Sequence, residues 1–100
     1  MSLEITPGDG SGVYVLEGEL DLLTARDLDA VASRDAAGEL VLDIERLTFI
    51  DSSGLRTLIR LAHGRPQDRP LVLRRPSSSA KRLLDIAFGD GGVPGMRIAS

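Results

Sequence analysis

The segment at residues 47–55, Leu-Thr-Phe-Ile-Asp-Ser-Ser-Gly-Leu, carries the residue types whose spacing best fits chemistry in this chain. An apolar, strand-like approach ends at Asp51, two hydroxyls follow at Ser52 and Ser53, and a helical pattern begins after Gly54. The first turn of a helix exposes unpaired backbone N–H groups and the positive end of the helix dipole. A phosphoryl group on a serine at this place is therefore well accommodated. The alternative is that Asp51 or Ser52 is only an N-cap, a role these residue types commonly have.

Three other serines, at residues 77–79, follow Pro76 and precede a second helical pattern. One of them is predicted to cap that helix. We expect phosphorylation at this run less than at Ser53, because no comparable set of charged residues surrounds it.

Catalysis by side chains is poorly supported. His63 is the only histidine, and its place near the end of a helix predicts stabilisation by the helix dipole rather than a role as a base. The glycine-rich segment 8–12 lacks the lysine and the helix of a phosphate-binding loop and is predicted to be a hairpin loop. A hydrolase that used Ser53 would need a paired base, and none is evident. We predict no catalytic residue, no cofactor and no metal site.

Composition narrows the class of protein. One hundred residues make one domain, residues 1–100, that can bury a single core. The net charge of −3 argues against a nucleic-acid partner, and the absence of cysteine excludes disulfides. No apolar stretch approaches the ~20 residues of a membrane span, and the N-terminus lacks a signal-peptide pattern. We expect a soluble, cytoplasmic protein without direct membrane insertion.

The chain must then position the segment 47–55 through alternating strands and helices. A turn at 7–12 predicts a hairpin, and Gly18 predicts a bulge or a close backbone approach near the end of its second strand. Thr24 with Asp27 resembles a weak capping box at the start of a helix. The remaining patterns predict strands at 3–5, 13–20, 39–44, 71–73 and 96–99, and helices from Thr24, over 55–62 and over 81–88.

The resulting order is β-β-α-β-α-β-α-β. Strands joined by helices form a parallel or mixed sheet with right-handed crossovers. We predict a single α/β domain with a mixed central sheet of about four to five strands and helices mainly on one face. Because aromatic residues make up only 3% of the chain, the core should be aliphatic.

Three segments together resemble a known family. Gly18-Glu19-Leu20-Asp21, then Val41-Leu42-Asp43, then the segment 49–55 are similar in order and spacing to the STAS domain of bacterial anti-sigma factor antagonists. The resemblance covers about residues 3–88, and Asp-Ser-Ser-Gly-Leu after an aliphatic strand is its most specific part. Members commonly finish with a further helix, which is expected to be missing here.

The resemblance implies a non-enzymatic, partner-switching regulator of transcription. An anti-sigma factor that is also an ATP-dependent serine kinase holds a sigma factor inactive. The unphosphorylated antagonist binds that kinase and frees the sigma factor, the kinase then phosphorylates the antagonist, and a PP2C-type phosphatase resets it.

The family pattern carries this scheme onto named positions. It places the phosphorylation at Ser53, with Ser52 as the less favoured acceptor. The residues expected at the partner surface are Asp21, Asp51, Ser52, Gly54, Leu55 and Arg56.

A second function stays open, because STAS-like domains also serve as structural or regulatory subunits of membrane lipid-transport or signalling assemblies. The intact serine favours the first function, since a purely structural role needs no hydroxyl there.

Overall fold

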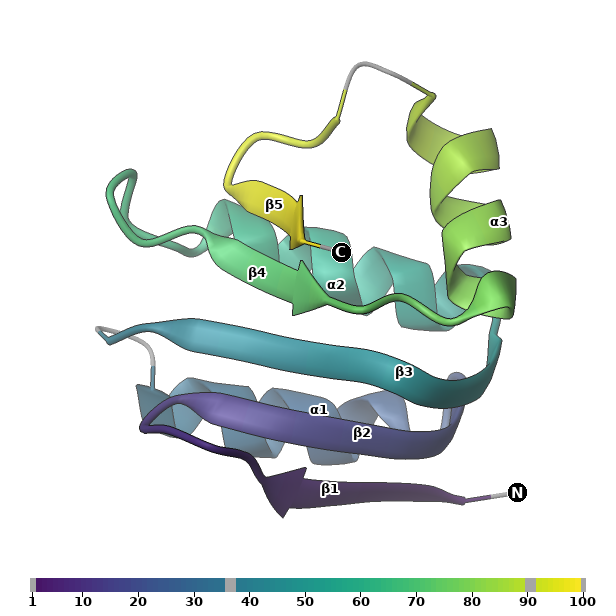
Figure 1. Ribbon diagram of the computed structural model, residues 1–100, viewed down its shortest axis with the longest axis horizontal. Coiled ribbons are helices and arrows are strands. Elements are labelled where there is room, and N and C mark those ends of the chain that lie inside the picture. The colour runs from purple at the N-terminus through teal and green to yellow at the C-terminus, as the bar shows by residue number, and fades with distance from the viewer. Residues whose placement is uncertain (1, 36–37, 90–91, 100) are drawn as a thin grey trace.

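The computed structural model describes residues 2–35, 38–89 and 92–99 (Figure 1). Its elements follow the predicted order, with one short 3₁₀ helix, η1, added after the first helix. They are β1 (Leu3–Pro7), β2 (Val13–Leu20), α1 (Ala25–Ala32), η1 (Ser33–Asp35), β3 (Leu40–Ile50), α2 (Ser52–His63), β4 (Leu71–Arg74), α3 (Ser78–Phe88) and β5 (Met96–Ala99).

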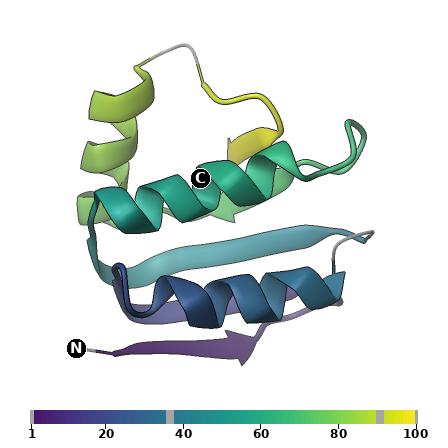
Figure 2. The ribbon, with the colours of Figure 1, turned by 180° about the vertical axis from the view of Figure 1, so that it is seen from behind.

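The strands form one mixed sheet in the order β1-β2-β3-β4-β5. β1 and β2 are the antiparallel hairpin that the turn at 7–12 predicts, and every later pair is parallel. α1 and α2 lie side by side on one face of the sheet, while α3 stands at one end of it (Figures 1 and 2). The predicted fold class is confirmed.

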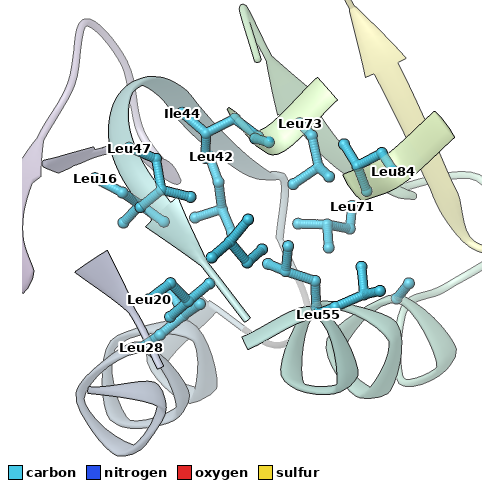
Figure 3. Packing of buried hydrophobic residues seen from close by; sticks show 14 of the residues in the cluster. Leu16, Leu20, Leu28, Leu42, Ile44, Leu47, Leu55, Leu71, Leu73 and Leu84 are labelled. Atoms are coloured by element: carbon cyan, nitrogen blue, oxygen red, sulfur yellow. The ribbon is translucent and has the colours of Figure 1, made fainter. Parts of the chain in front are cut away.

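The core is aliphatic, as the composition predicts, and lies between the sheet and the helices (Figure 3). All three helices contribute to a single cluster, with α1 supplying Leu28, α2 supplying Leu58 and α3 supplying Leu84. These leucines pack against strand residues that are almost completely buried: Leu16, Leu20, Leu40, Leu42, Ile44, Leu47, Leu71 and Leu73. Burial of aliphatic area of this kind is the main force that holds the layers together.

β3 is longer than predicted. The continuous apolar run ends at Ile44, but the strand continues to Ile50 because β2 pairs with it along its whole length. Two register shifts between β2 and β3 interrupt the simple alternation of buried and exposed residues, and at each of them β3 carries the extra residue; one lies between Gly18 and Glu19. Gly18 has a φ of 114°, a conformation that favours glycine, and a Cβ atom there would lie 2.4 Å from the Ser2 carbonyl oxygen. Of the two features predicted at Gly18, the close backbone approach is therefore confirmed, and the extra residue of the neighbouring register shift belongs to β3.

Within residues 2–35, 38–89 and 92–99, none of the helices combines the length and the apolar character needed to cross a bilayer.

Candidate functional site

The site lies where two neighbouring strands end. Leu20 and Ile50 are register partners in the parallel pair β2–β3, so the loops that follow them leave the sheet at the same edge. The Asp51 N–H donates to the Leu20 carbonyl oxygen at 3.3 Å, which ties these two strand ends together. Carboxyl ends of parallel strands are the usual location of binding sites in such sheets.

Asp51 is the N-cap of α2. Its backbone is extended, with φ −109° and ψ −175°, and its side chain accepts a hydrogen bond from the Gly54 N–H at 2.9 Å. The predicted cap is therefore confirmed for Asp51. Ser52 is the first residue of the helix and is exposed, and Ser53 follows it half-buried.

Gly54 and Leu55 face inward. A Cβ atom built on Gly54 would lie 2.5 Å from the Leu20 carbonyl oxygen and 2.8 Å from the Leu20 Cγ atom. The first turn of α2 therefore approaches β2 so closely that only glycine fits at position 54. Leu55 is only 9% exposed and belongs to the core cluster. Both residues were expected at a partner surface, and the structure buries them.

Asp21 organises the loop between β2 and α1. Its Oδ1 atom accepts hydrogen bonds from the N–H groups of Leu23 and Thr24, both at 3.0 Å, and from the Thr24 hydroxyl at 3.1 Å. These bonds, led by the one from the Thr24 N–H, hold the pKa of Asp21 below its usual value. Asp21 is only 9% exposed, so it shapes the loop more than it presents a charge.

The predicted capping box between Thr24 and Asp27 is wrong. Thr24 is the N-cap of α1, but its side chain makes no cap hydrogen bond. The Thr24 hydroxyl instead donates to the Glu19 carbonyl oxygen at 2.8 Å and accepts from the Asp21 N–H at 2.9 Å. The side chain is thus turned back toward the end of β2, because Asp21 already satisfies the N–H groups of the loop.

A small hollow of about 180 Å³ joins the two loops. It lies between the start of α1 and the first turns of α2, and Ser53 is on its wall. The full lining is Leu22, Ala25, Ser53, Arg56, Thr57 and Arg60. The Thr57 hydroxyl donates a hydrogen bond to the Ser53 carbonyl oxygen at 3.2 Å. Ser53 therefore borders a surface depression and is half-buried, not enclosed by the core.

Two exposed leucines near this hollow, Leu22 and Leu23, were not predicted from the sequence. Leu22 is 68% exposed and Leu23 is 75% exposed, in a protein whose other leucines are mostly buried. Large apolar side chains this exposed commonly mark a contact surface when they stand next to one another. The signal in the sequence was a pair of leucines outside the apolar repeat of the following helix.

The other candidates have structural roles. The Ser77 side chain accepts from the Ala80 N–H at 3.2 Å and so caps α3, as predicted for one residue of this run. His63 is the last residue of α2 and is exposed. Among the described residues, no group of three His, Cys, Asp or Glu side chains could hold a metal ion.

A second charged cluster, away from this site, centres on Asp43 in the middle of β3. Its side chain is 2% exposed and accepts from Arg74 at 3.2 Å, from the Arg75 Nε atom at 3.1 Å and from the Glu45 N–H at 3.2 Å. Burial alone would raise the pKa of Asp43, but these hydrogen bonds outweigh it and lower the pKa. The cluster holds β3 to the end of β4.

Comparison with known proteins identifies the class. The family model described as "Mlab, STAS domain" matches residues 6–91. The chain therefore belongs to the STAS domain family.

The fold is also that of a solved structure, described as the anti-sigma factor antagonist SpoIIAA in its unphosphorylated form. The two superpose with a TM-score of 0.65 over 99% of this chain and 90% of the other, at 22% sequence identity. An identity this low establishes the shared fold alone.

Proposed function

We propose that this protein is an anti-sigma factor antagonist. In its unphosphorylated form it binds an anti-sigma factor that is also a serine kinase, and the sigma factor is released. Phosphorylation of Ser53 ends the binding, and a PP2C-type phosphatase restores it. The protein acts by binding and not by catalysis.

The observation that carries this proposal is the position of Ser53. It lies in the first turn of α2 beside a surface hollow, while the cap of that helix is Asp51. Within residues 2–35, 38–89 and 92–99, no hydrogen bond engages the Ser53 hydroxyl, whereas the Ser77 hydroxyl is used as a cap. A serine with no structural task at this place is available as an acceptor.

The chemistry balances with ATP as the donor. The Ser53 oxygen attacks the γ-phosphorus of ATP bound to the kinase, the hydroxyl proton is lost and ADP leaves. Hydrolysis by the phosphatase returns the hydroxyl and releases inorganic phosphate.

The product repels the docked partner. A phosphoserine adds about −1.5 to −2 charge at neutral pH, and this charge would lose its water in a docked interface. A loss of only about 2–3 kcal/mol weakens binding roughly 30- to 150-fold. The free protein retains the modification, because the start of α2 favours negative charge.

The proposed partner surface consists of Ser52, Ser53 and Arg56 on α2 together with Leu22 and Leu23 on the neighbouring loop. Asp21, Asp51, Gly54 and Leu55 support it from below by holding the loop and the helix start in place.

The test uses the cognate kinase and three variants. We expect Ser53→Ala to bind the purified kinase whether or not ATP is present, and Ser53→Asp to bind it roughly 30-fold more weakly or worse. Ser79→Ala, at an exposed serine of α3 outside the proposed surface, is the matched control and should behave as the wild type does. Mass spectrometry after incubation with kinase and ATP should find the phosphate on Ser53. Modification confined to residues 77–79 would contradict the assignment.

A second candidate is a structural or regulatory subunit of a membrane lipid-transport or signalling assembly. The observation that supports this second candidate is the description of the matched family model, "Mlab, STAS domain". Neighbouring genes separate the two candidates: a sigma factor or an ATP-binding kinase supports the first, and a transporter permease supports the second. In the second case Ser53→Ala and Ser53→Asp would bind their partner alike.

A further inference from the structure

One face of α2 brings two cations to the proposed phosphorylation site. Arg56, Thr57 and Arg60 lie three, four and seven residues after Ser53. Residues at these spacings lie along the same side of a helix. All four line the hollow of about 180 Å³ beside the start of α1. A phosphate on Ser53 would therefore enter a space whose wall carries two guanidinium groups.

The nearby carboxylates are already engaged elsewhere. Asp51 accepts from the Gly54 N–H, and Asp21 accepts from the N–H groups of its own loop. Neither lines the hollow. The charged side chains that do line it are Arg56 and Arg60, so its electrostatic character is positive.

The two arginines differ in their present contacts. In the described part of the chain Arg56 forms no ion pair and is exposed. The Arg60 Nη2 atom lies 2.5 Å from the Asp29 Oδ2 atom, an ion pair that joins α2 to α1. The side chains of that pair are 59% and 39% exposed, and pairs so open to water contribute little to stability.

We propose that Arg56 and Arg60 form an intramolecular binding site for the phosphate of phospho-Ser53, and that Arg60 exchanges Asp29 for this phosphate. The inference rests on the proposed function, because it describes the phosphorylated state of that same serine. It adds a receptor for the phosphate and a structural consequence, the loss of the ion pair between α1 and α2.

The exchange follows from charge and geometry. A guanidinium donates two parallel hydrogen bonds to a phosphate, and a phosphoserine near neutral pH carries more charge than a carboxylate. Arg60 gives up only an exposed contact when it turns from Asp29 to the hollow. Arg56, which has no ion pair to break, provides the second contact.

The test measures the phosphate itself. Phosphoserine is placed at position 53 during synthesis of the full chain by an expanded genetic code, so no kinase is needed. Phosphorus NMR then follows the second ionisation of the phosphate as a function of pH. That pKa is about 6 for a free phosphoserine, and neighbouring cations lower it because they favour the dianion.

We expect the phosphate pKa of the otherwise wild-type chain to lie about 0.5 to 1 unit below that of the Arg56→Gln/Arg60→Gln double variant. Arg34→Gln is the matched control, since it removes an exposed arginine of η1, which follows the end of α1, and should leave the pKa unchanged. Asp29→Asn frees Arg60 from its competitor and should lower the pKa further.

Equal pKa values in the wild-type chain and the double variant would overturn the inference. An unchanged pKa in Asp29→Asn would overturn the exchange of partners by Arg60. Either result leaves the proposed function standing if kinase and ATP still modify Ser53. Conversely, a kinase that ignores Ser53 contradicts the proposed function without affecting this titration.

Discussion

Gly54 is the residue at which the start of α2 touches the backbone of β2. A Cβ atom there would lie 2.5 Å from the Leu20 carbonyl oxygen and 3.1 Å from the Ile50 Cγ1 atom, and neither can move without disturbing the sheet or the core. The glycine in Asp-Ser-Ser-Gly is thus required by packing, and this packing also positions Ser53, the proposed acceptor.

We expect Gly54→Ala to destabilise the protein by about 1–3 kcal/mol, the usual cost of overpacking. Urea unfolding measures the change. Gly38→Ala is the matched control, because a Cβ at Gly38 meets no atom within 4 Å. Equal stability of the two variants would show that the helix start can shift to make room.

Asp21 acts at the same scale by holding the loop that carries Leu22 and Leu23. In Asp21→Ala the N–H groups of Leu23 and Thr24 lose their acceptor. We expect both amides to exchange with solvent faster, while amides in β4 stay as protected as before. Hydrogen exchange followed by NMR checks this, and unchanged protection at Thr24 would contradict the role assigned to Asp21.

Between elements, Asp43 links β3 to β4 through Arg74 and Arg75. Because the pKa of Asp43 is lowered in the folded state, its contribution to stability is fully present above the unfolded pKa of about 3.9. That contribution is lost as the pH falls through the lower, folded pKa. Acid should therefore weaken this link only below about pH 4.

We expect Asp43→Asn to lower the unfolding free energy at pH 7 by about 1–3 kcal/mol, since two guanidinium groups lose their buried negative partner. The difference between variant and wild type should shrink in acid. Denaturant unfolding from pH 2 to 7 measures it. Asp9→Asn, which removes an exposed partner of Arg74, is the control and should change stability by less than about 1 kcal/mol.

Some helices and strands could be predicted from the sequence better than others. Helices and strands with a regular apolar period were predicted in order, because that period reflects burial directly. The end of β3 was missed, since residues such as Arg46 and Phe49 are exposed and the extra residues that β3 carries opposite β2 break the alternation. Contacts between distant segments left no local trace either. Leu22 beside Ser53 is one case. The hydrogen bond from the Thr24 hydroxyl to the Glu19 carbonyl oxygen, five residues earlier in the chain, was missed as well.

On the surface of the whole molecule, Leu22 and Leu23 expose apolar side chains to solvent. Both are more than two-thirds exposed, so they add little to the stability of the free protein. We expect Leu22→Ser/Leu23→Ser to change the unfolding free energy by less than about 1 kcal/mol, yet to weaken binding of the kinase at least tenfold, by about 1.4 kcal/mol. Calorimetric titration measures the binding.

The exposed Ile86 on α3 provides the control for that experiment, because it is 75% exposed but does not line the hollow. Ile86→Ser should bind as the wild type does. Weakening by Ile86→Ser equal to that by the leucine variant would place the partner over a different face.

The strands lie across the sheet in the same succession as they occur along the chain. Every residue that lines the hollow comes from positions 22–60, and the elements on which it rests, β2, α1, β3 and α2, are complete at His63. On the ribosome, the parts that present the serine are therefore made before β4, α3 and β5 emerge. The later part of the chain contributes no residue to the wall of the hollow, so changes there would act on the proposed switch only indirectly.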